Sequence, residues 1–210
     1  MVGQSAVAEP VIDMVADPVA GERDDTLERP TTWVDLLELP EDMGQRHEII
    51  GGEHIVSPSP SMDHQGVHHE IYIRLGAHIL AGRLGVLRSG PIDIKSSEYD
   101  VVVPDIVFVR AGRPGVIRRG GQAMTEPPDL VVKIASPSTR RRDRIQKLAF
   151  YARFGVREYW LVDPVARTWE TLVLEGGVYR ALPPEGTVHR SRVVERFTVD
   201  AAEVFAALDA

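Results

Sequence analysis

The sequence predicts a mixed α/β chain with one central sheet and helices against it, and three features of the 210 residues support this. First, apolar residues recur every four positions between residues 63 and 80, which indicates one face of a helix. Second, runs rich in β-branched residues, such as Val101–Arg110 and Asp129–Ala135, indicate strands. Third, the glycine pairs at 51–52 and 176–177 separate further strand-like runs and predict hairpins.

The first 30 residues differ from the rest of the chain in charge and in pattern. They carry seven acidic and two basic residues, a net charge of −5, whereas the other 180 residues account for only −2 of the total −7. Because the segment has no helical or strand periodicity, we expect residues 1–30 to form a mobile acidic leader and residues 31–210 to form a single domain. This nearly neutral domain has no global basic field, so any contact with nucleic acid must come from local patches.

Helices are expected where a capping residue precedes an apolar stripe. They are a short helix after Thr32 that ends at Pro40, a helix from Ser61 or Asp63 to about Leu80 ended by Gly82 and Gly85, a helix over about Arg140–Phe154 ended by Gly155, and a terminal helix over Ala201–Leu208. Strands are expected over Arg46–Ile50, Glu53–Ser57, Val86–Ser89, Ile92–Lys95, Val101–Arg110, Asp129–Ala135, Glu158–Val162, Thr168–Leu174 and Val178–Leu182.

The composition excludes several classes of protein. The chain has no cysteine, which excludes disulfides, thiolate nucleophiles and cysteine-bound zinc. No stretch approaches the roughly 18 apolar residues that span a membrane, and the N-terminus lacks a basic region followed by an apolar run. We therefore expect a soluble, cytoplasmic protein without a membrane partner.

Two charged residues interrupt the apolar strand patterns. Asp105 shares a strand face with several valines and is costly to bury unless it is paired or binds a metal; alternatively, Pro104-Asp105 is a turn with a solvated acid. Lys133 shares a face with Val131 and Ala135. Its stem either covers apolar surface while its amine reaches water, or its ammonium points into a polar site. The pattern leaves both alternatives open.

The helix expected before Gly155 has two candidate inner faces. Ile145 lies on an apolar face, whereas Asp143, Lys147 and Tyr151 lie four apart on the other side. Periodicity does not decide which face meets the sheet, and the default for the Asp143–Lys147 pair is a weak surface ion pair. Glu48, just before a glycine turn, is most simply a solvated strand acid.

Histidines and arginines give two further candidate sites. His64 and His68 fall near the apolar stripe of their helix and His69 points away; buried structural histidines are favoured over zinc, since no third ligand has suitable spacing. A basic cluster near the start of the third long helix is either a solvated face or a phosphate contact. Its members are Arg140, Arg141, Arg142 and Arg144.

Taken together, several motifs resemble the Uma2 family of putative restriction endonucleases, within the PD-(D/E)XK nuclease superfamily. They span about residues 32–182 and are His47–Glu53, Ser57–Pro60 with His64, Pro104-Asp105, Pro127–Val132, Ser136–Thr139 with Asp143, Lys147 and Tyr151, and Gly155–Trp160 with Asp163-Pro164. The resemblance implies a restriction-endonuclease-like fold: a central mixed sheet flanked by helices, here with added hairpins.

The resemblance also implies a phosphodiesterase site that uses Mg²⁺ or Mn²⁺. In that pattern Asp105 is a metal ligand, Glu48 assists it, and Lys147 is the catalytic lysine. Carboxylate oxygens suit magnesium, which then offsets charge on the phosphoryl oxygens. We therefore predict that Glu48, Asp105, Lys133 and Lys147 converge in one cleft.

This sequence departs from the family pattern at position 133. The second metal-binding acid is expected there, and an ammonium in its place opposes metal binding. Two hypotheses follow. In the first, Glu48 and Asp105 still hold one metal ion with Lys133 as the catalytic cation, and the chain is a metal-dependent DNA endonuclease that uses Glu48, Asp105 and Lys147. In the second, hydrolysis is impaired or lost through Lys133, and the chain is a non-catalytic nuclease-like module that binds nucleic acid or a protein partner. It is also a candidate homodimer.

Overall fold

The computed structural model describes residues 29–209 except 40–44, 114, 118–120, 137–140 and 142. The predicted leader therefore lies outside the described residues, apart from its last two positions. The helical elements are α1 (Trp33–Leu37), α2 (Met62–Gly82), the π-helical turn η1 (Asp143–Lys147), α4 (Leu148–Phe154), α5 (Ala201–Ala206) and the 3₁₀ turn η2 (Ala207–Asp209). Within this part of the chain, no helix is both long and apolar enough to cross a membrane.

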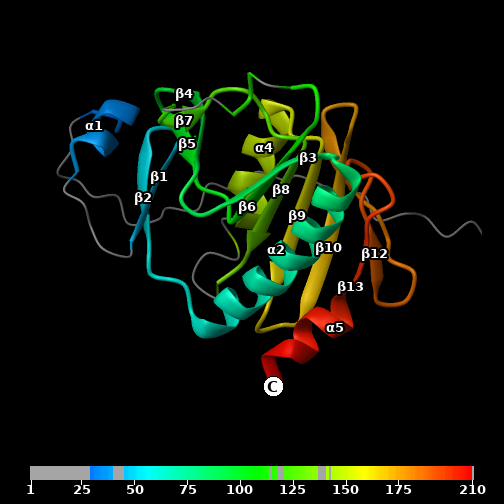
Figure 1. Cartoon of the computed structure of the whole chain (residues 1–210). Coiled ribbons are helices and arrows are strands. Elements are labelled where there is room, and N and C mark those ends of the chain that lie inside the picture. The colour runs from blue at the N-terminus through cyan, green and yellow to red at the C-terminus, as the bar shows by residue number, and fades with distance from the viewer. Residues whose placement is uncertain are drawn as a thin grey trace, which may run out of the picture.

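The strands form two mixed sheets and a ribbon (Figure 1). The five-stranded sheet has the order β2 (Glu53–Ser57), β1 (Arg46–Ile50), β5 (Asp100–Val102), β4 (Asp93–Ser97), β7 (Ala123–Met124). The six-stranded sheet has the order β11 (Val178–Ala181), β10 (Thr168–Glu175), β9 (Glu158–Asp163), β8 (Leu130–Ile134), β6 (Ile106–Arg110), β3 (Gly85–Ser89). The ribbon pairs β12 (Val188–Arg190) with β13 (Thr198–Asp200). The predicted α/β class with mixed sheets flanked by helices is confirmed, whereas the expectation of a single sheet is wrong.

The chain passes from one sheet to the other within the segment predicted as the single strand Val101–Arg110. Strand β5 pairs with β1 and β4, whereas β6 pairs with β3 and β8. Pro104 stands between them, where it has no N–H to give to a ladder. The N–H of Asp105 then bonds the carbonyl of Val132 at 3.1 Å. The break places Asp105 at the junction of the two sheets.

The six-stranded sheet lies between α2 and α4 (Figure 1). Alternate residues of β6 face opposite sides: Ile106 and Phe108 pack with the buried stripe of α2, while Val107 and Val109 pack with α4. This alternation follows from the period of two in a strand. Lys133 on β8 is out of phase with Val132 and Ile134, which face α2. Its side chain therefore starts on the α4 side of the sheet.

Local expectations hold where the signal is a tight turn. Gly51 and Gly52 have φ of 61° and 82°, as a primed hairpin turn requires, and so join β1 to β2. The end of α2 differs, because Arg83 rather than a glycine takes the left-handed cap position, with φ of 51°. Strands β7, β12 and β13 were not predicted, since two or three residues are too short to show a period of two.

Candidate functional site

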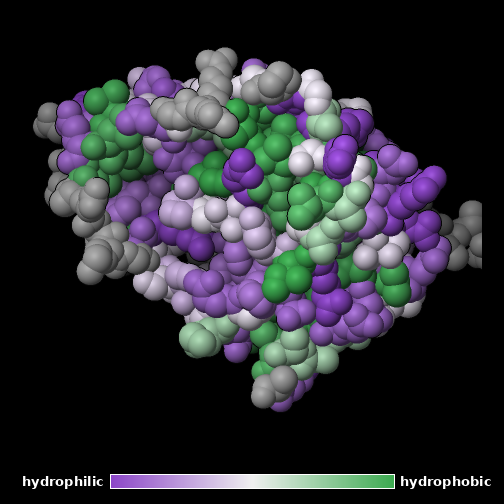
Figure 2. All heavy atoms as spheres, in the orientation of Figure 1, coloured by the Kyte–Doolittle hydropathy of each residue, from purple (hydrophilic) through white to green (hydrophobic). Residues whose placement is uncertain are grey.

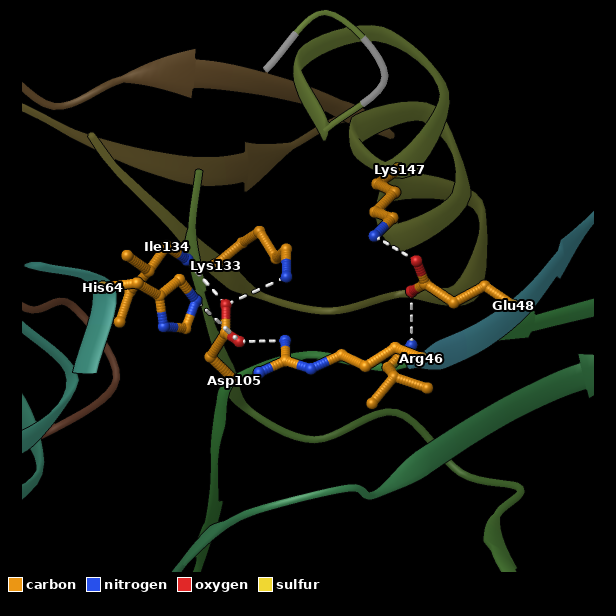
Figure 3. Close-up of polar contacts among 8 residues, drawn as sticks. Arg46, Glu48, His64, Asp105, Lys133, Ile134 and Lys147 are labelled. Atoms are coloured by element: carbon orange, nitrogen blue, oxygen red, sulfur yellow. Dashed lines mark hydrogen bonds and ion pairs between the residues drawn. The ribbon is translucent and has the colours of Figure 1, made fainter. Parts of the chain in front are cut away.

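A buried ion cluster surrounds Asp105 (Figure 3). The Lys133 Nζ lies 3.0 Å from Oδ2, and His64 Nε2 lies 3.2 Å from Oδ1. Arg46 forms a further ion pair with Oδ1, and the N–H of Ile134 donates to Oδ2 at 2.7 Å. The Asp105 side chain is fully buried, so these donors replace the water that an ionised carboxylate would otherwise need.

The surroundings of Asp105 favour its ionised form. Burial alone would raise the pKa of this carboxyl, but the charge of Lys133, the hydrogen bond from His64 and the charge of Arg46 hold the pKa well below its ordinary value. The carboxylate is therefore charged at neutral pH, and its charge is balanced from within the protein.

Glu48 and Lys147 form a second buried pair beside this cluster (Figure 3). Glu48 Oε2 accepts a 2.6 Å hydrogen bond from Lys147 Nζ, and Oε1 accepts the N–H of Val103 at 2.7 Å. Lys147 ends η1, and π-helical turns occur frequently at functional sites. Asp93 on β4 lies in the field of Glu48; burial and that charge raise the pKa of Asp93 to about 6.

Lys147 belongs to the face that turns toward the sheet. Lys147, Phe150 and Tyr151 are buried, whereas Ile145, on the apolar face, is 55 % exposed. The buried Glu48 supplies the partner that makes this inward position favourable for a lysine, which periodicity alone did not decide. The side chain of Asp143 lies outside the described residues.

A pocket of about 260 Å³ opens onto the ion cluster. It is lined by Arg46, Glu48, Ser57, Pro58, Ser59, Pro60, Ser61, His64, Lys133, Ile134 and Ser136. Figure 2 shows hydrophilic residues gathered on this side of the molecule, between the β1–β2 hairpin and the N-terminal half of α2. Asp105 is not part of the lining, so Lys133 and Arg46 stand between its carboxylate and the pocket.

The three candidate histidines separate in the structure. His64 is 5 % exposed and joins the cluster through Nε2, while its buried Nδ1 has no hydrogen-bond partner within the described residues. His68 is half-buried and stacks on Tyr72, and burial lowers its pKa. His69 is exposed. In the described part of the chain, no three His, Cys, Asp or Glu side chains are placed to share a metal ion.

The two described members of the basic cluster, Arg141 and Arg144, are not among the residues that line the pocket. Arg141 and Arg144 are exposed, and Arg144 forms an ion pair with Glu170 on β10. Arg140 and Arg142 lie outside the described residues. The cation that the sequence analysis missed is Arg46, which lies two residues before Glu48 on the same strand and thus on the same face. That spacing is the signal that could have identified it.

Three comparisons with known proteins bear on this site. A family model named Uma2 and described as "Putative restriction endonuclease" matches residues 33–202. A crystal structure of "a putative nuclease belonging to DUF820 from Anabaena variabilis ATCC 29413" superposes with a TM-score of 0.69 at 20 % sequence identity, covering 85 % of this chain and 99 % of that chain. At this identity the likeness concerns the fold. The comparison with curated proteins gives no match.

Proposed function

Because the chain belongs to the Uma2 family of putative restriction endonucleases, we propose that it is a nuclease-like protein that binds the DNA backbone at this pocket and whose metal-dependent cleavage is impaired. The observation that carries this proposal is the 3.0 Å ion pair between Lys133 and Asp105. The family resemblance implies a metal ligand at Asp105, and an ammonium is its partner here.

The residues present do not fit a divalent metal ion. Magnesium and manganese need carboxylate oxygens with free lone pairs. Each oxygen of Asp105 already accepts from two donors, Arg46 and His64 at Oδ1 and Lys133 and the Ile134 N–H at Oδ2, and Glu48 is ion-paired with Lys147. A cation would have to displace an ammonium or guanidinium from each acid, against direct electrostatic repulsion. We therefore derive no hydrolytic step through Mg²⁺ or Mn²⁺.

DNA binding is supported by the positive charge of two residues that line the pocket. Arg46 and Lys133 line it, and phosphates attract such groups by a salt-dependent, sequence-independent term. We propose that the exposed Arg141 and Arg144, with Arg140 and Arg142, extend this contact along the backbone. Arg144, which is already paired with Glu170, should contribute less than Arg141. The homodimer and the cytoplasmic location remain predictions.

Two assays test the proposal. Fluorescence anisotropy with a labelled duplex in EDTA should show binding that weakens steeply as salt is raised. A supercoiled-plasmid assay should show no nicking that Mg²⁺ or Mn²⁺ stimulates. Metal-stimulated nicking that Asp105→Asn abolishes would overturn the impairment and restore the endonuclease hypothesis.

A charge reversal sharpens the test. Lys133→Glu removes the internal counter-ion and adds a third carboxylate, so calorimetry should detect manganese binding that the unchanged protein lacks, and nicking should appear if Lys147 is suitably placed. The matched control is Arg180→Glu, a reversal on the exposed strand β11, which should leave the metal response unchanged. Equal metal responses in the unchanged protein and in Lys133→Glu would contradict a site role for Lys133.

A further inference from the structure

We propose that the pocket is a metal-independent phosphate site, in which Lys133 and Arg46 supply the positive charge that a metal ion supplies in an active nuclease. The ligand is a tetrahedral phosphate group, bound as an anion where the family pattern would bind a cation. This inference deepens the proposed function and rests on it, since the same pocket would hold a phosphate of DNA.

The charges of the cluster do not cancel: one positive charge remains in excess on the side that faces the pocket. Lys147 and Glu48 neutralise each other, with side chains only 1 % and 2 % exposed. Asp105 balances one of its two cationic neighbours, Lys133 and Arg46, and its own side chain is fully buried behind them. Even with His64 left out of the count, the side of the cluster that faces the pocket carries a net positive charge, which suits an anion and opposes a second cation.

Hydrogen-bond donors of the right kind surround that charge. The guanidinium of Arg46 is a quarter exposed and can present a planar pair of N–H groups to phosphate oxygens. Serine hydroxyls contribute to the lining from the 57–61 segment and from Ser136. Ser61 caps the N-terminus of the 21-residue helix α2, the end whose dipole favours anions.

His64 gives an independent indication that this pocket can take a ligand. It lines the pocket and is 95 % removed from solvent, yet its Nδ1 has no partner within the described residues. A buried polar nitrogen without a hydrogen bond is costly. A phosphate oxygen that shares a hydrogen bond with this nitrogen would satisfy it.

The size of the pocket limits the ligand to a small group. Its volume of about 260 Å³ lies below the roughly 300–1,000 Å³ of pockets that hold drug-sized ligands. One phosphate with part of the neighbouring sugar fits this space better than an entire nucleotide. We therefore infer that the site holds a single phosphate and that any base lies outside it.

The experiment measures phosphate binding to the full chain in EDTA. Thermal melts with increasing sodium phosphate, at constant ionic strength set with sodium chloride, should show a saturable rise in Tm, because a ligand of the native state raises apparent stability. Lys133→Met, which keeps an apolar stem, and Arg46→Gln should each weaken the apparent phosphate affinity by at least about tenfold. Arg180→Gln, on exposed β11, should change it less than about twofold, as expected for a distant surface charge.

Each result has one meaning. A saturable rise that Lys133→Met and Arg46→Gln both remove, and Arg180→Gln retains, supports the site. No rise in the unchanged protein, or an equal rise in all three variants, overturns it. If either of these overturning results is found and DNA still binds, the proposed function stands without the phosphate site. If phosphate binds as expected but DNA does not, the proposed function alone fails.

Competition identifies the source of the phosphate. A short oligothymidylate with a 5′-phosphate is compared with the same strand ending in a 5′-hydroxyl, each displacing inorganic phosphate. If only the phosphorylated strand displaces phosphate, the site binds a strand end. If both strands displace it equally, the site binds an internal phosphodiester. Displacement by neither overturns the nucleic-acid assignment.

Discussion

Glu158 and Asp105 are both buried carboxylates beside the six-stranded sheet, and opposite kinds of partner hold them. Within the described residues Glu158 accepts from neutral donors: the Trp160 Nε1 at 2.6 Å, the backbone N–H groups of Arg192 and Val193 at 2.6 and 3.2 Å, and the Ser191 side chain. Asp105 accepts from Lys133, Arg46 and His64 as well as from one backbone N–H.

The pKa values of the two groups shift in opposite directions for this reason. Burial raises the pKa of Glu158, and neutral donors offset this only in part. Around Asp105, the charge of Lys133 and the other cationic neighbours outweigh burial and lower the pKa. Burial of a carboxylate therefore does not identify a functional site. What makes Asp105 the candidate is that two of its cationic partners, Lys133 and Arg46, also line a pocket.

The largest expected effect comes from removing the Glu158 carboxylate, which is held by neutral donors. Glu158→Ala leaves Trp160 Nε1 and the N–H of Arg192 without their acceptor, whereas the N–H of Val193 keeps its 3.1 Å bond to Ser191 Oγ; each buried donor left unpaired costs about 1–3 kcal/mol. We expect the free energy of unfolding to fall by about 3–5 kcal/mol in urea titrations, while phosphate and DNA affinity stay unchanged. The control, Glu175→Ala on the exposed end of β10, should have no measurable effect. A loss of phosphate affinity as large as the loss of stability would contradict the separation of the two regions.

The next largest effect comes from breaking the buried ion pair between Glu48 and Lys147 beside the pocket. Lys147→Met leaves the Glu48 carboxylate buried without its cation, and loss of one partner of a buried pair costs about 3–5 kcal/mol. Because Val103 still donates to Glu48, we expect the lower end of that range. Adding Glu48→Gln in a double variant should recover part of the loss. Additive losses in the double variant would show that the two residues are not coupled.

Acid titration should separate the two carboxylates by sign. The lowered pKa of Asp105 means that its contribution to stability is complete above its ordinary pKa of 3.8 and is lost as pH falls through the folded value. The stability difference between the unchanged protein and Asp105→Asn should therefore shrink below about pH 4. The raised pKa of Glu158 means that folding favours its protonated form.

For Glu158 the unchanged protein should thus gain stability relative to Glu158→Gln as pH falls through the raised folded value toward 4.5. Urea midpoints measured between pH 3 and 7, a window set by these ordinary carboxyl values, check both trends. Parallel trends for the two variants would refute the contrast.

The smallest effect is expected from removing the acidic N-terminal leader, which belongs to neither of the two regions compared above. The leader lies outside the described residues except for Arg29 and Pro30, and its aperiodic sequence predicts a mobile segment. Removal of residues 1–28 should change the Tm by less than about 3 °C, a shift that corresponds to under 1 kcal/mol for a domain of this size. A fall of many degrees would show instead that the leader docks on the domain.

Local physics explains which parts of the fold the sequence could predict. The glycine turns, the stripe of α2 and the hairpin strands depend on neighbours within a few residues, and they lie where expected. The segment Val101–Arg110 was predicted as one strand because its apolar run is nearly continuous. Its division between two sheets depends on partners in β1, β4, β3 and β8, which periodicity does not encode.

The candidate site shows the same division residue by residue. Asp105 and Lys133 could be singled out because a charge interrupts an apolar pattern, and the family resemblance added Glu48 and Lys147. Their catalytic and metal-binding roles remain predictions. Whether the Lys133 amine reaches water or a polar site was open, and its 3.0 Å contact with Asp105 decides the geometry. Arg46 was missed because a single strand arginine resembles any solvated cation.

The sequence by itself determined the family, the order of most elements and the positions at which charges enter the apolar strands, since each depends on residue type and short-range spacing. Only the tertiary structure decided the sign of the pocket. That sign depends on which charges meet across long separations, such as the 59 residues between Arg46 and Asp105 and the 99 residues between Glu48 and Lys147. Coulomb energy depends on distance in space and on burial. Folding therefore brings the cations Arg46 and Lys133, together with the acid Glu48, into the lining of one pocket.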